Sequence, residues 1–473
     1  MRNSKSPDTT RRQFLAAGGV GLLSLLGLGG AKSALGAISL RPKSSKLSGN
    51  LTPTLSLERR GGKVTDPVPD HVLVTIFLRG GADALSLLAP YADDRYYRAR
   101  PTIALGSPKS GRKDSLHDLN GYFGLHPSLS PLLGLYESNQ LAFIHACGSG
   151  DETRSHFEAM ATMERGLYQE DGPASGWLAR HLETAPWENP TPLRAVALGS
   201  LIPDSLVGAP SATAVSSADD LKLVSGFPGG DDAIRRHLSR LYGDDPHFAP
   251  GAPTSSPSRF GRGAEERGGV GPGSDLQVAG AEALAVLQKI ENLSPGTYKP
   301  SNGAAYPADD LGNGLKQTAF LIKSSLGMEA ACLDHGGFDT HVTQGAAQGA
   351  LAGRLDSLAK GISAFAADLG AERWRKVTVV VISEFGRRIE ENSGAGTDHG
   401  HGGLMMVLGG QGIDGGKIHG RWPGLSEIDG PGDLLVTTDY RNVLGEILTK
   451  RVGNDALGSI FPGLDYQPIG IVA

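Results

Sequence analysis

From residue 71 onward, short apolar runs alternate with longer stretches that have a helical spacing of apolar residues. The apolar runs are residues 71–78, 141–146, 193–198, 328–333, 377–382 and 404–408. The helical stretches between them are residues 152–166, 176–184, 311–325 and 351–369. Short runs of apolar and β-branched residues are typical of strands buried on both faces. Their alternation with helices predicts an α/β fold with a mostly parallel central sheet and helices on both faces.

The start of the chain has the features of an export signal. Two arginines at residues 11–12 precede an apolar, glycine-rich stretch at residues 18–30. That stretch is shorter than the roughly 20 apolar residues that a membrane-spanning helix needs, and small residues follow it. We therefore predict a twin-arginine signal peptide at residues 1–37, read by the twin-arginine translocation machinery, and no stable membrane span. The folded protein is expected in the periplasm or outside the cell.

Two further segments lack any hydrophobic period. Residues 38–70 are rich in serine, proline, glycine and basic residues, which predicts a flexible linker between the signal and a folded domain at residues 71–473. Within that domain, residues 246–274 are dominated by glycine, proline, serine and arginine. We interpret this second segment as a flexible surface insertion, with a substrate lid as the alternative.

Charge and cysteine content narrow the class of protein. The formal net charge is −5, and no stripe of basic residues interleaved with aromatics is present, so nucleic acid is not an expected partner. The chain has two cysteines, Cys147 and Cys332, each at the end of an apolar run. They could form one disulfide in an oxidising compartment or remain two buried thiols.

Acidic residues and histidines gather next to the ends of four expected strands. These clusters are residues 79–83, 334–341, 383–388 and 397–403. Parallel sheets place their sites at the carboxyl ends of the strands, and mixed carboxylates and imidazoles suit Zn²⁺, Mn²⁺ or iron. Asp339 and His341 are two residues apart, as are His399 and His401, so each pair can face one ion from an extended segment. We expect one or two divalent ions, with zinc or manganese favoured.

A candidate nucleophile lies in residues 151–158, where hydroxyl side chains precede a helix. One interpretation has metal-bound Ser155 or Thr153 attack an ester phosphorus or sulfur, while Arg154 or His156 meets the developing anion. The alternative is an ordinary helix cap by Asp151 or Thr153.

Five motifs carry a resemblance to a known family. They are residues 77–83 (FLRGGAD), 96–101 (YYRARP), 153–157 (TRSHF), 336–341 (GGFDTH) and 383–387 (SEFGR). With these motifs and its twin-arginine start, the chain resembles the bacterial family called domain of unknown function 1501. That family is similar in organisation to the alkaline phosphatase and sulfatase superfamily, so the resemblance implies an alkaline phosphatase-like domain.

The resemblance also implies roles for individual residues. Asp83 corresponds to the metal carboxylate after the first strand, and Ser155 corresponds to the nucleophile. Asp339, His341 and His401 correspond to one metal site, and Glu384 to the carboxylate of a second site, which His399 would have to complete. Phe385 stands where the superfamily has a metal-binding histidine, and no Cys-x-Pro-x-Arg sequence occurs.

The sequence therefore leaves two alternative functions. The first is an exported metal-dependent hydrolase of a phosphate or sulfate ester, whose substrate is a small ester or is linked to a polysaccharide. The second is a non-catalytic cell-envelope binding protein that retains the alkaline phosphatase-like fold.

Overall fold

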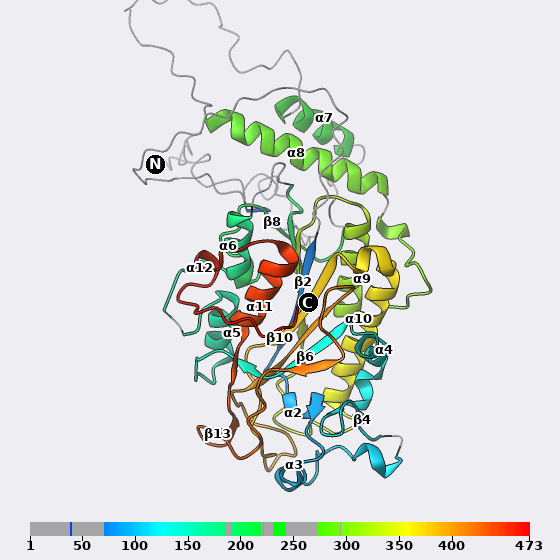
Figure 1. The fold of residues 1–473 in the computed structure, drawn as a ribbon. Coiled ribbons are helices and arrows are strands. Elements are labelled where there is room, and N and C mark those ends of the chain that lie inside the picture. Colours follow the sequence, from blue (N-terminus) through cyan, green and yellow to red (C-terminus); the bar gives the residue numbers. More distant parts are fainter. Residues whose placement is uncertain are drawn as a thin grey trace, which may run out of the picture. The chain divides into compact units, whose positions relative to one another are not determined.

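The computed structural model describes residues 38–39, 71–112, 114–169, 171–185, 191–218, 221, 230–242, 272–293 and 295–473 (Figure 1). The predicted signal peptide at residues 1–37, the predicted linker beyond Ser39, and residues 246–271 of the predicted insertion lie outside the described residues. The chain divides into two compact units, Met1–Ser217 with Lys299–Ala473 and, separately, Ala218–Tyr298.

Every apolar run that was expected to form a strand does so in the first unit. These strands are β2 (Val72–Arg79), β6 (Leu141–Gly148), β7 (Ala195–Leu198), β9 (Ala330–Gly336), β10 (Val377–Ser383) and β11 (Gly403–Gly409). They join β1 (Ile38–Ser39), β8 (Ala212–Val215), β12 (Lys417–His419) and β15 (Thr438–Asp439) in one sheet. The strand order is β1-β8-β7-β9-β2-β10-β11-β6-β12, and β15 pairs with β6.

The sheet is mixed but mostly parallel. Strands β8, β7, β9, β2 and β10 are parallel neighbours, with β2 in the centre between β9 and β10. Strand β11 runs antiparallel to both β10 and β6. Consequently β6 runs in the same direction as β10. The expected α/β class and mostly parallel sheet are confirmed.

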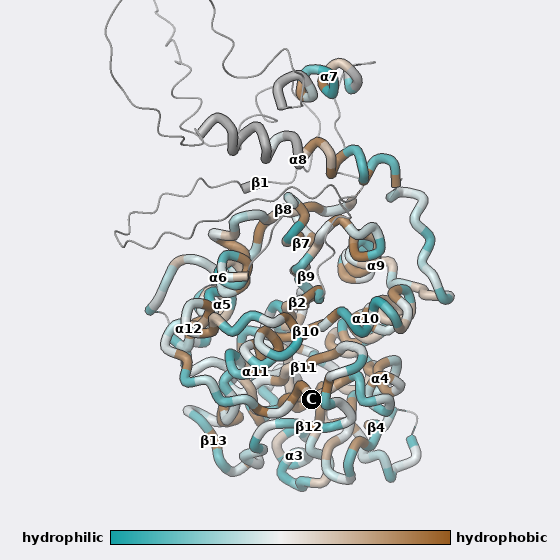
Figure 2. The backbone as a smooth tube through the Cα atoms, turned by 45° about the horizontal axis from the view of Figure 1, so that its top comes forward, coloured by the Kyte–Doolittle hydropathy of each residue, from teal (hydrophilic) through white to brown (hydrophobic). Residues whose placement is uncertain are grey.

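Helices flank the sheet on two sides in Figure 1. One group is α5 (His156–Glu164), α6 (Trp177–Thr184), α11 (Tyr440–Ile447) and α12 (Leu457–Ile460). The other is α4 (Leu133–Glu137), α9 (Asp310–Lys323) and α10 (Ala350–Trp374). A buried cluster joins Leu73 and Phe77 of β2 to Trp177 and Leu178 of α6. Hydrophobic and hydrophilic stretches alternate along the covering helices, as expected when one helix face packs on a sheet (Figure 2).

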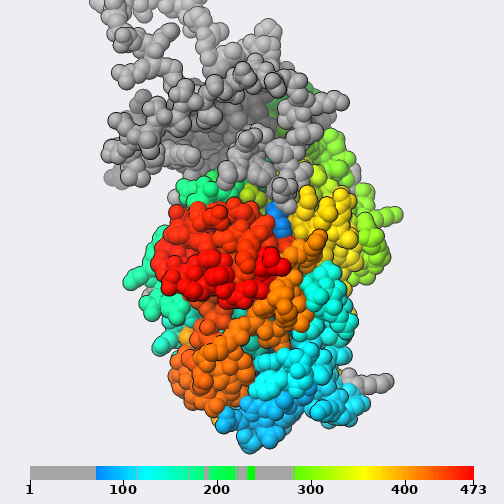
Figure 3. Space-filling model, viewed as in Figure 1, coloured from blue at the N-terminus to red at the C-terminus, as the bar shows by residue number. Residues whose placement is uncertain are grey.

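Shorter elements complete the first unit. The helices are α2 (Ala84–Leu87), α3 (Asp94–Ala99), η1 (Pro108–Ser110), η2 (Pro127–Leu132), η3 (Asp204–Leu206) and the π-helical turn η7 (Leu448–Val452). The strands are β3 (Leu88–Ala89), β4 (His117–Asp118), β5 (Gly124–Leu125), β13 (Ile428–Asp429) and β14 (Asp433–Leu434). Segments that are distant in sequence lie side by side in this part of the unit. In Figure 3, blue and cyan residues near the start of the domain lie beside orange residues near its end. One contact between them is the hydrogen bond that Trp422 Nε1 donates to the Tyr122 hydroxyl at 3.2 Å.

In the second unit, α7 (Gly230–Tyr242) packs on α8 (Pro272–Leu293), and Arg235 forms an ion pair with Glu291 at 2.7 Å. η6 (Pro295–Thr297) follows α8. The last three residues of the predicted insertion, 272–274, form the start of α8.

Both cysteines are free and buried, so the structure shows the two-thiol alternative. Burial raises the pKa of Cys332 to about 12 and raises that of Cys147 as well. Among the described residues, no helix combines the length and apolar character needed to cross a membrane.

Candidate metal centre

The direction of the strands brings five loops to one edge of the sheet. Strands β2, β6, β9 and β10 run in the same direction, so their carboxyl ends meet at that edge. Because β11 is reversed, the segment that precedes it arrives at the same edge. The clusters expected from the sequence therefore converge, although the last of them precedes a strand instead of following one.

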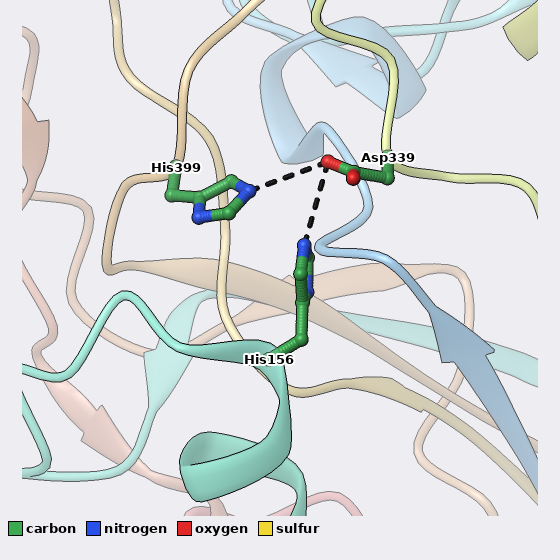
Figure 4. Close-up of side chains that lie close together, drawn as sticks. All are labelled: His156, Asp339 and His399. Carbon is green, nitrogen blue, oxygen red and sulfur yellow. Dashed lines mark hydrogen bonds and ion pairs between the residues drawn. The ribbon is translucent and has the colours of Figure 1, made fainter.

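Three side chains from separate loops face one another at this edge: His156, Asp339 and His399 (Figure 4). Their nearest ligand atoms all lie within 4.8 Å of one another. Oδ1 of Asp339 lies 3.4 Å from His156 Nε2 and 3.3 Å from His399 Nε2. Ligands at about 2.0–2.1 Å around a tetrahedral zinc ion are roughly 3.3 Å apart. The two contacts of Asp339 thus match the spacing of ligands around one divalent ion, and the donor types suit such an ion.

A third imidazole borders this group. Nε2 of His341 lies 3.1 Å from Asp339 Oδ1 and 2.9 Å from His399 Nε2. The structure therefore brings together three of the six predicted metal ligands, Asp339, His341 and His399.

The outer ring nitrogens of the facing histidines have acceptors as partners. Nδ1 of His156 lies 2.7 Å from Glu384 Oε1, and Nδ1 of His399 lies 2.8 Å from the Arg154 carbonyl oxygen. Because a carboxylate and a carbonyl can only accept, both Nδ1 atoms carry hydrogen and each Nε2 of a neutral ring presents a lone pair. Nε2 of His156 is buried and makes no hydrogen bond. A buried nitrogen whose lone pair has no hydrogen-bond donor is suited to act as a metal ligand.

His341 has the same arrangement. Its Nδ1 lies 3.0 Å from Asp398 Oδ1, and the Asn392 amide donates to that carboxylate oxygen at 2.9 Å. The hydrogen bonds from Asn392 and His341 lower the pKa of Asp398, so this carboxyl is an anionic acceptor at neutral pH. Histidines that bind metals commonly donate their other ring nitrogen to a carboxylate or a carbonyl.

Glu384 orients His156 instead of entering the donor set. It is almost fully buried and accepts hydrogen bonds from His156 and from the Gly80 N–H at 2.7 Å. Burial opposes its ionisation, but these hydrogen bonds lower its pKa below the ordinary value. The hydrogen bond to Glu384 in turn raises the pKa of His156, whereas burial lowers the pKa of His399.

A buried guanidinium, Arg387, ties the loops of the site together. It donates to Asp339 Oδ1 at 2.6 Å, to the Gly81 carbonyl at 2.7 Å and to the Thr397 carbonyl at 2.8 Å. Burial opposes ionisation of Asp339, yet the hydrogen bond and charge of Arg387 lower its pKa to about 2. Asp339 is therefore anionic at neutral pH, and an ion in the site would share its charge with Arg387.

Two glycines after β2 allow this close approach. Gly80 has φ +117°, and a Cβ there would lie 2.5 Å from the Asp339 nitrogen. Gly81 has φ +66°, and its Cβ would lie 2.5 Å from the Phe385 ring. Larger residues would be strained at both positions, and a side chain at position 80 would push the Asp339 loop away from β2.

Asp83 lies outside the donor set. Its side chain is fully buried, and Arg100 binds both carboxylate oxygens at 2.6 and 2.9 Å. Ser86 and Gln344 also donate to Oδ2, at 2.6 and 2.7 Å. Despite burial, these partners lower the pKa of Asp83. The carboxylate is committed to a structural network.

His401 is also engaged elsewhere. Its Nδ1 lies 2.5 Å from Asp429 Oδ2, and its Nε2 lies 3.0 Å from the Ser149 carbonyl. Both ring nitrogens thus have oxygen partners away from the candidate centre. Of the pair His399 and His401, only His399 faces the candidate centre.

The segment before α5 is arranged largely as a helix start. Asp151 accepts from the Thr153 N–H at 2.9 Å, and the Thr153 hydroxyl donates to Glu158 at 2.6 Å. Ser155 is the N-cap residue of α5, directly before His156, and its hydroxyl has no hydrogen-bond partner among the described residues. Thr153 is therefore committed locally, and Ser155 is the free hydroxyl.

The side chains of Arg154 and His156, which were expected to stabilise a developing anion, contact other protein groups instead. The Arg154 guanidinium pairs with buried Asp433, and its carbonyl orients His399. His156 belongs to the donor set, which sequence reasoning missed. Its position in the segment after β6 could have indicated that it belongs to the site. Neither its residue type nor its sequence neighbours distinguish a metal ligand from an acid–base group.

In a comparison with known families, one family model covers part of the chain that forms this site. Residues 324–436 match the family model described as "Protein of unknown function (DUF1501)". The matched segment contains Asp339, His341, Glu384 and His399, but not His156. No curated protein and no solved structure matches the chain.

Proposed function

We propose that this protein is an exported, metal-dependent hydrolase of a phosphate or sulfate ester, with an alkaline phosphatase-like domain. The observation that carries the proposal is the convergence of His156 Nε2, His399 Nε2 and Asp339 Oδ1 on one point, with His156 Nε2 lacking any hydrogen bond. Imidazole and carboxylate donors suit Zn²⁺ or Mn²⁺. Since Asp83 and His401 are committed elsewhere, we propose one ion.

The ion would supply Lewis-acid polarisation of an ester oxygen. The chain's own residues supply its orientation: Glu384 and the Arg154 carbonyl hold the two histidine rings, and Arg387 holds Asp339. Ser155 is the proposed nucleophile, because its hydroxyl is free and stands at the N-terminus of α5, where developing negative charge is favoured.

Two partly exposed arginines near the site could contact an anionic ester. The side chains of Arg154 and Arg388 are 38% and 35% exposed, and both approach the same carboxylate, Asp433. The charge of Arg388 also lowers the pKa of Asp398, which directly precedes His399, so the two cations are balanced by two carboxylates. The exposed parts of the two guanidinium groups would donate hydrogen bonds to a phosphate or sulfate group.

The test is elemental analysis of the purified protein together with a screen of aryl phosphates and aryl sulfates in the presence of Zn²⁺ or Mn²⁺. We expect about one ion per chain and measurable turnover. Ser155→Ala should retain the ion and lose turnover. Turnover that survives Ser155→Ala would remove that residue as nucleophile, and a chain that neither binds an ion nor hydrolyses an ester would refute the proposed activity.

One observation favours the alternative, a non-catalytic envelope binding protein. Arg387 Nη2 lies 2.6 Å from Asp339 Oδ1, so the aspartate charge is neutralised without an ion. A folded protein that excludes metal under all conditions would support this second function.

Export by the twin-arginine route remains part of the proposal. Replacing Arg11 and Arg12 together by lysine should leave the precursor in the cytoplasm, as judged by fractionation. Undiminished export of that variant would contradict it.

A further inference from the structure

A cavity of about 270 Å³ is lined in part by residues that are sequence neighbours of the candidate metal centre. The residues of its lining that matter here are Arg79, Phe157, Glu164, Leu201, Asp204 and Asp334. Phe157 directly follows His156 in α5. Arg79 directly precedes Gly80, whose nitrogen donates to Glu384. Consecutive Cα atoms are about 3.8 Å apart, so the backbone of the cavity wall lies next to that of the centre.

Two walls of the cavity are apolar and open to solvent. The side chains of Phe157 and Leu201 are 83% and 81% exposed, more than any other large hydrophobic residue described. Exposed apolar groups that gather around a concave surface commonly mark a binding site. The ligand of this cavity should therefore have an apolar body.

The charged wall carries an excess of carboxylates. Arg79 pairs with Glu164 at 2.7 Å and with Asp334 at 2.8 Å. Asp204 adds a third acid, and its backbone N–H donates to Glu164 at 3.2 Å. The lining thus holds three carboxyl groups and one guanidinium. Burial raises the pKa of Glu164, but even a neutral Glu164 leaves two acids against Arg79.

We propose that this cavity is a subsite for an organic cation, a substituted ammonium with an apolar body, carried by the ester whose anionic end is bound at the metal centre. The inference rests on the proposed function, because it names a substituent of the same substrate. An exposed aromatic ring attracts such cations. The surplus carboxylates add a negative charge, which attracts a cation and repels an anion. The anionic and cationic ends of the substrate are thereby directed to opposite ends of the site.

A matched pair of substrates tests the charge alone. 4-(Trimethylammonio)phenyl phosphate and 4-tert-butylphenyl phosphate have nearly the same size and shape, and the corresponding sulfates form a second pair. We expect kcat/KM to be about tenfold higher for the cation, which is a difference of about 1.4 kcal/mol. Asp334→Asn should abolish most of this preference, and Phe157→Leu should reduce it while the apolar wall remains. Asp356→Asn, an exposed acid on α10, should leave it unchanged.

A binding measurement separates this inference from the proposed activity. Phenyltrimethylammonium should bind the full-length protein in calorimetry without any metal, and Asp334→Asn and Phe157→Leu should each weaken the binding. Binding without hydrolysis of any ester would support the subsite and contradict the hydrolase. Hydrolysis with equal kcat/KM for both substrates, and no binding of phenyltrimethylammonium, would overturn the subsite and leave the hydrolase standing.

Discussion

His399 and His401 are two residues apart, yet their ring nitrogens have different kinds of partner. Nε2 of His399 faces Asp339, whereas both nitrogens of His401 face acceptors outside the centre. Loss of a group that merely orients a metal ligand commonly lowers metal affinity about 10–100-fold, so loss of a ligand should lower it further. We expect His399→Ala to weaken Zn²⁺ binding by more than about 100-fold, measured by competition with a chromophoric chelator.

The control for this experiment is His401→Gln. It alters a histidine with comparable burial and should leave Zn²⁺ affinity within a few-fold of the parent protein. Equal loss in both variants would show that His401 belongs to the donor set and that the geometry described above is not the metal-bound one.

At the scale of loops and elements, one buried amide joins two of the three segments that carry the proposed ligands. Gln344 Oε1 accepts from the hydroxyls of Thr340 and Thr397, both at 2.8 Å. Thr340 lies between Asp339 and His341, and Thr397 is two residues before His399. The Gln344 amide nitrogen donates to Asp83, which fixes the amide to the start of α2. These hydrogen bonds hold the two loops in place, and none of them involves the side chain of a proposed metal ligand.

We expect Thr340→Val and Thr397→Val each to weaken Zn²⁺ binding about 10-fold, because each removes one hydrogen bond that positions a ligand loop. The same substitutions should lower the free energy of unfolding by about 1 kcal/mol. Thr213→Val in β8 makes the identical chemical change, since that buried hydroxyl donates to the Pro192 carbonyl. It should cost similar stability and leave metal affinity unchanged. An equal loss of Zn²⁺ affinity in Thr213→Val would show that the weaker binding results from general destabilisation.

At the scale of the whole molecule, buried neutral histidines should make the fold sensitive to acid. Nε2 of His145 lies 3.0 Å from the Leu88 carbonyl and its Nδ1 lies 3.0 Å from the Ala146 nitrogen, so the neutral ring donates once and accepts once. His126 has the same pattern. Burial lowers the pKa of His126, His145 and His181 to about 4 in each case.

The unfolded chain binds protons at these histidines near pH 6.5, and the folded chain does so only near pH 4. Stability is therefore complete above pH 6.5 and is lost as the pH falls through this window. At pH 5 the loss is on the order of 2 kcal/mol for each residue. Urea titrations of metal-free protein between pH 7.5 and pH 5 should show it, and His145→Gln should reduce the slope by about one proton. A free energy of unfolding independent of pH over this range would contradict the assignment.

The positions of the main strands and helices could be predicted from the sequence because their signals are local. A run such as residues 377–382 is apolar at consecutive positions, which only a doubly buried strand readily accommodates. The direction of such a strand in the sheet could not be predicted from this pattern. Residues 404–408 have the same pattern, yet β11 is antiparallel to its neighbours. Direction depends on the path of the connecting loop, which leaves no periodic signal.

The candidate site was predictable to a similar depth. The accumulation of carboxylates and imidazoles at strand ends pointed to Asp339, His341 and His399, because residue type and proximity to a strand end are both local properties. Only the tertiary structure decided which nitrogens face one another. His156 and His399 meet across 243 positions of sequence because Glu384 and the Arg154 carbonyl take their outer nitrogens.

Asp83 shows the limit most plainly. Its type and its position after the first strand of the domain made it a candidate ligand, and both properties were judged correctly. Its carboxylate is nevertheless bound on both oxygens by Arg100, 17 residues further along the chain. A carboxylate's chemistry is fixed by its residue type, but whether it is free to bind an ion is decided by the charge that the fold places beside it.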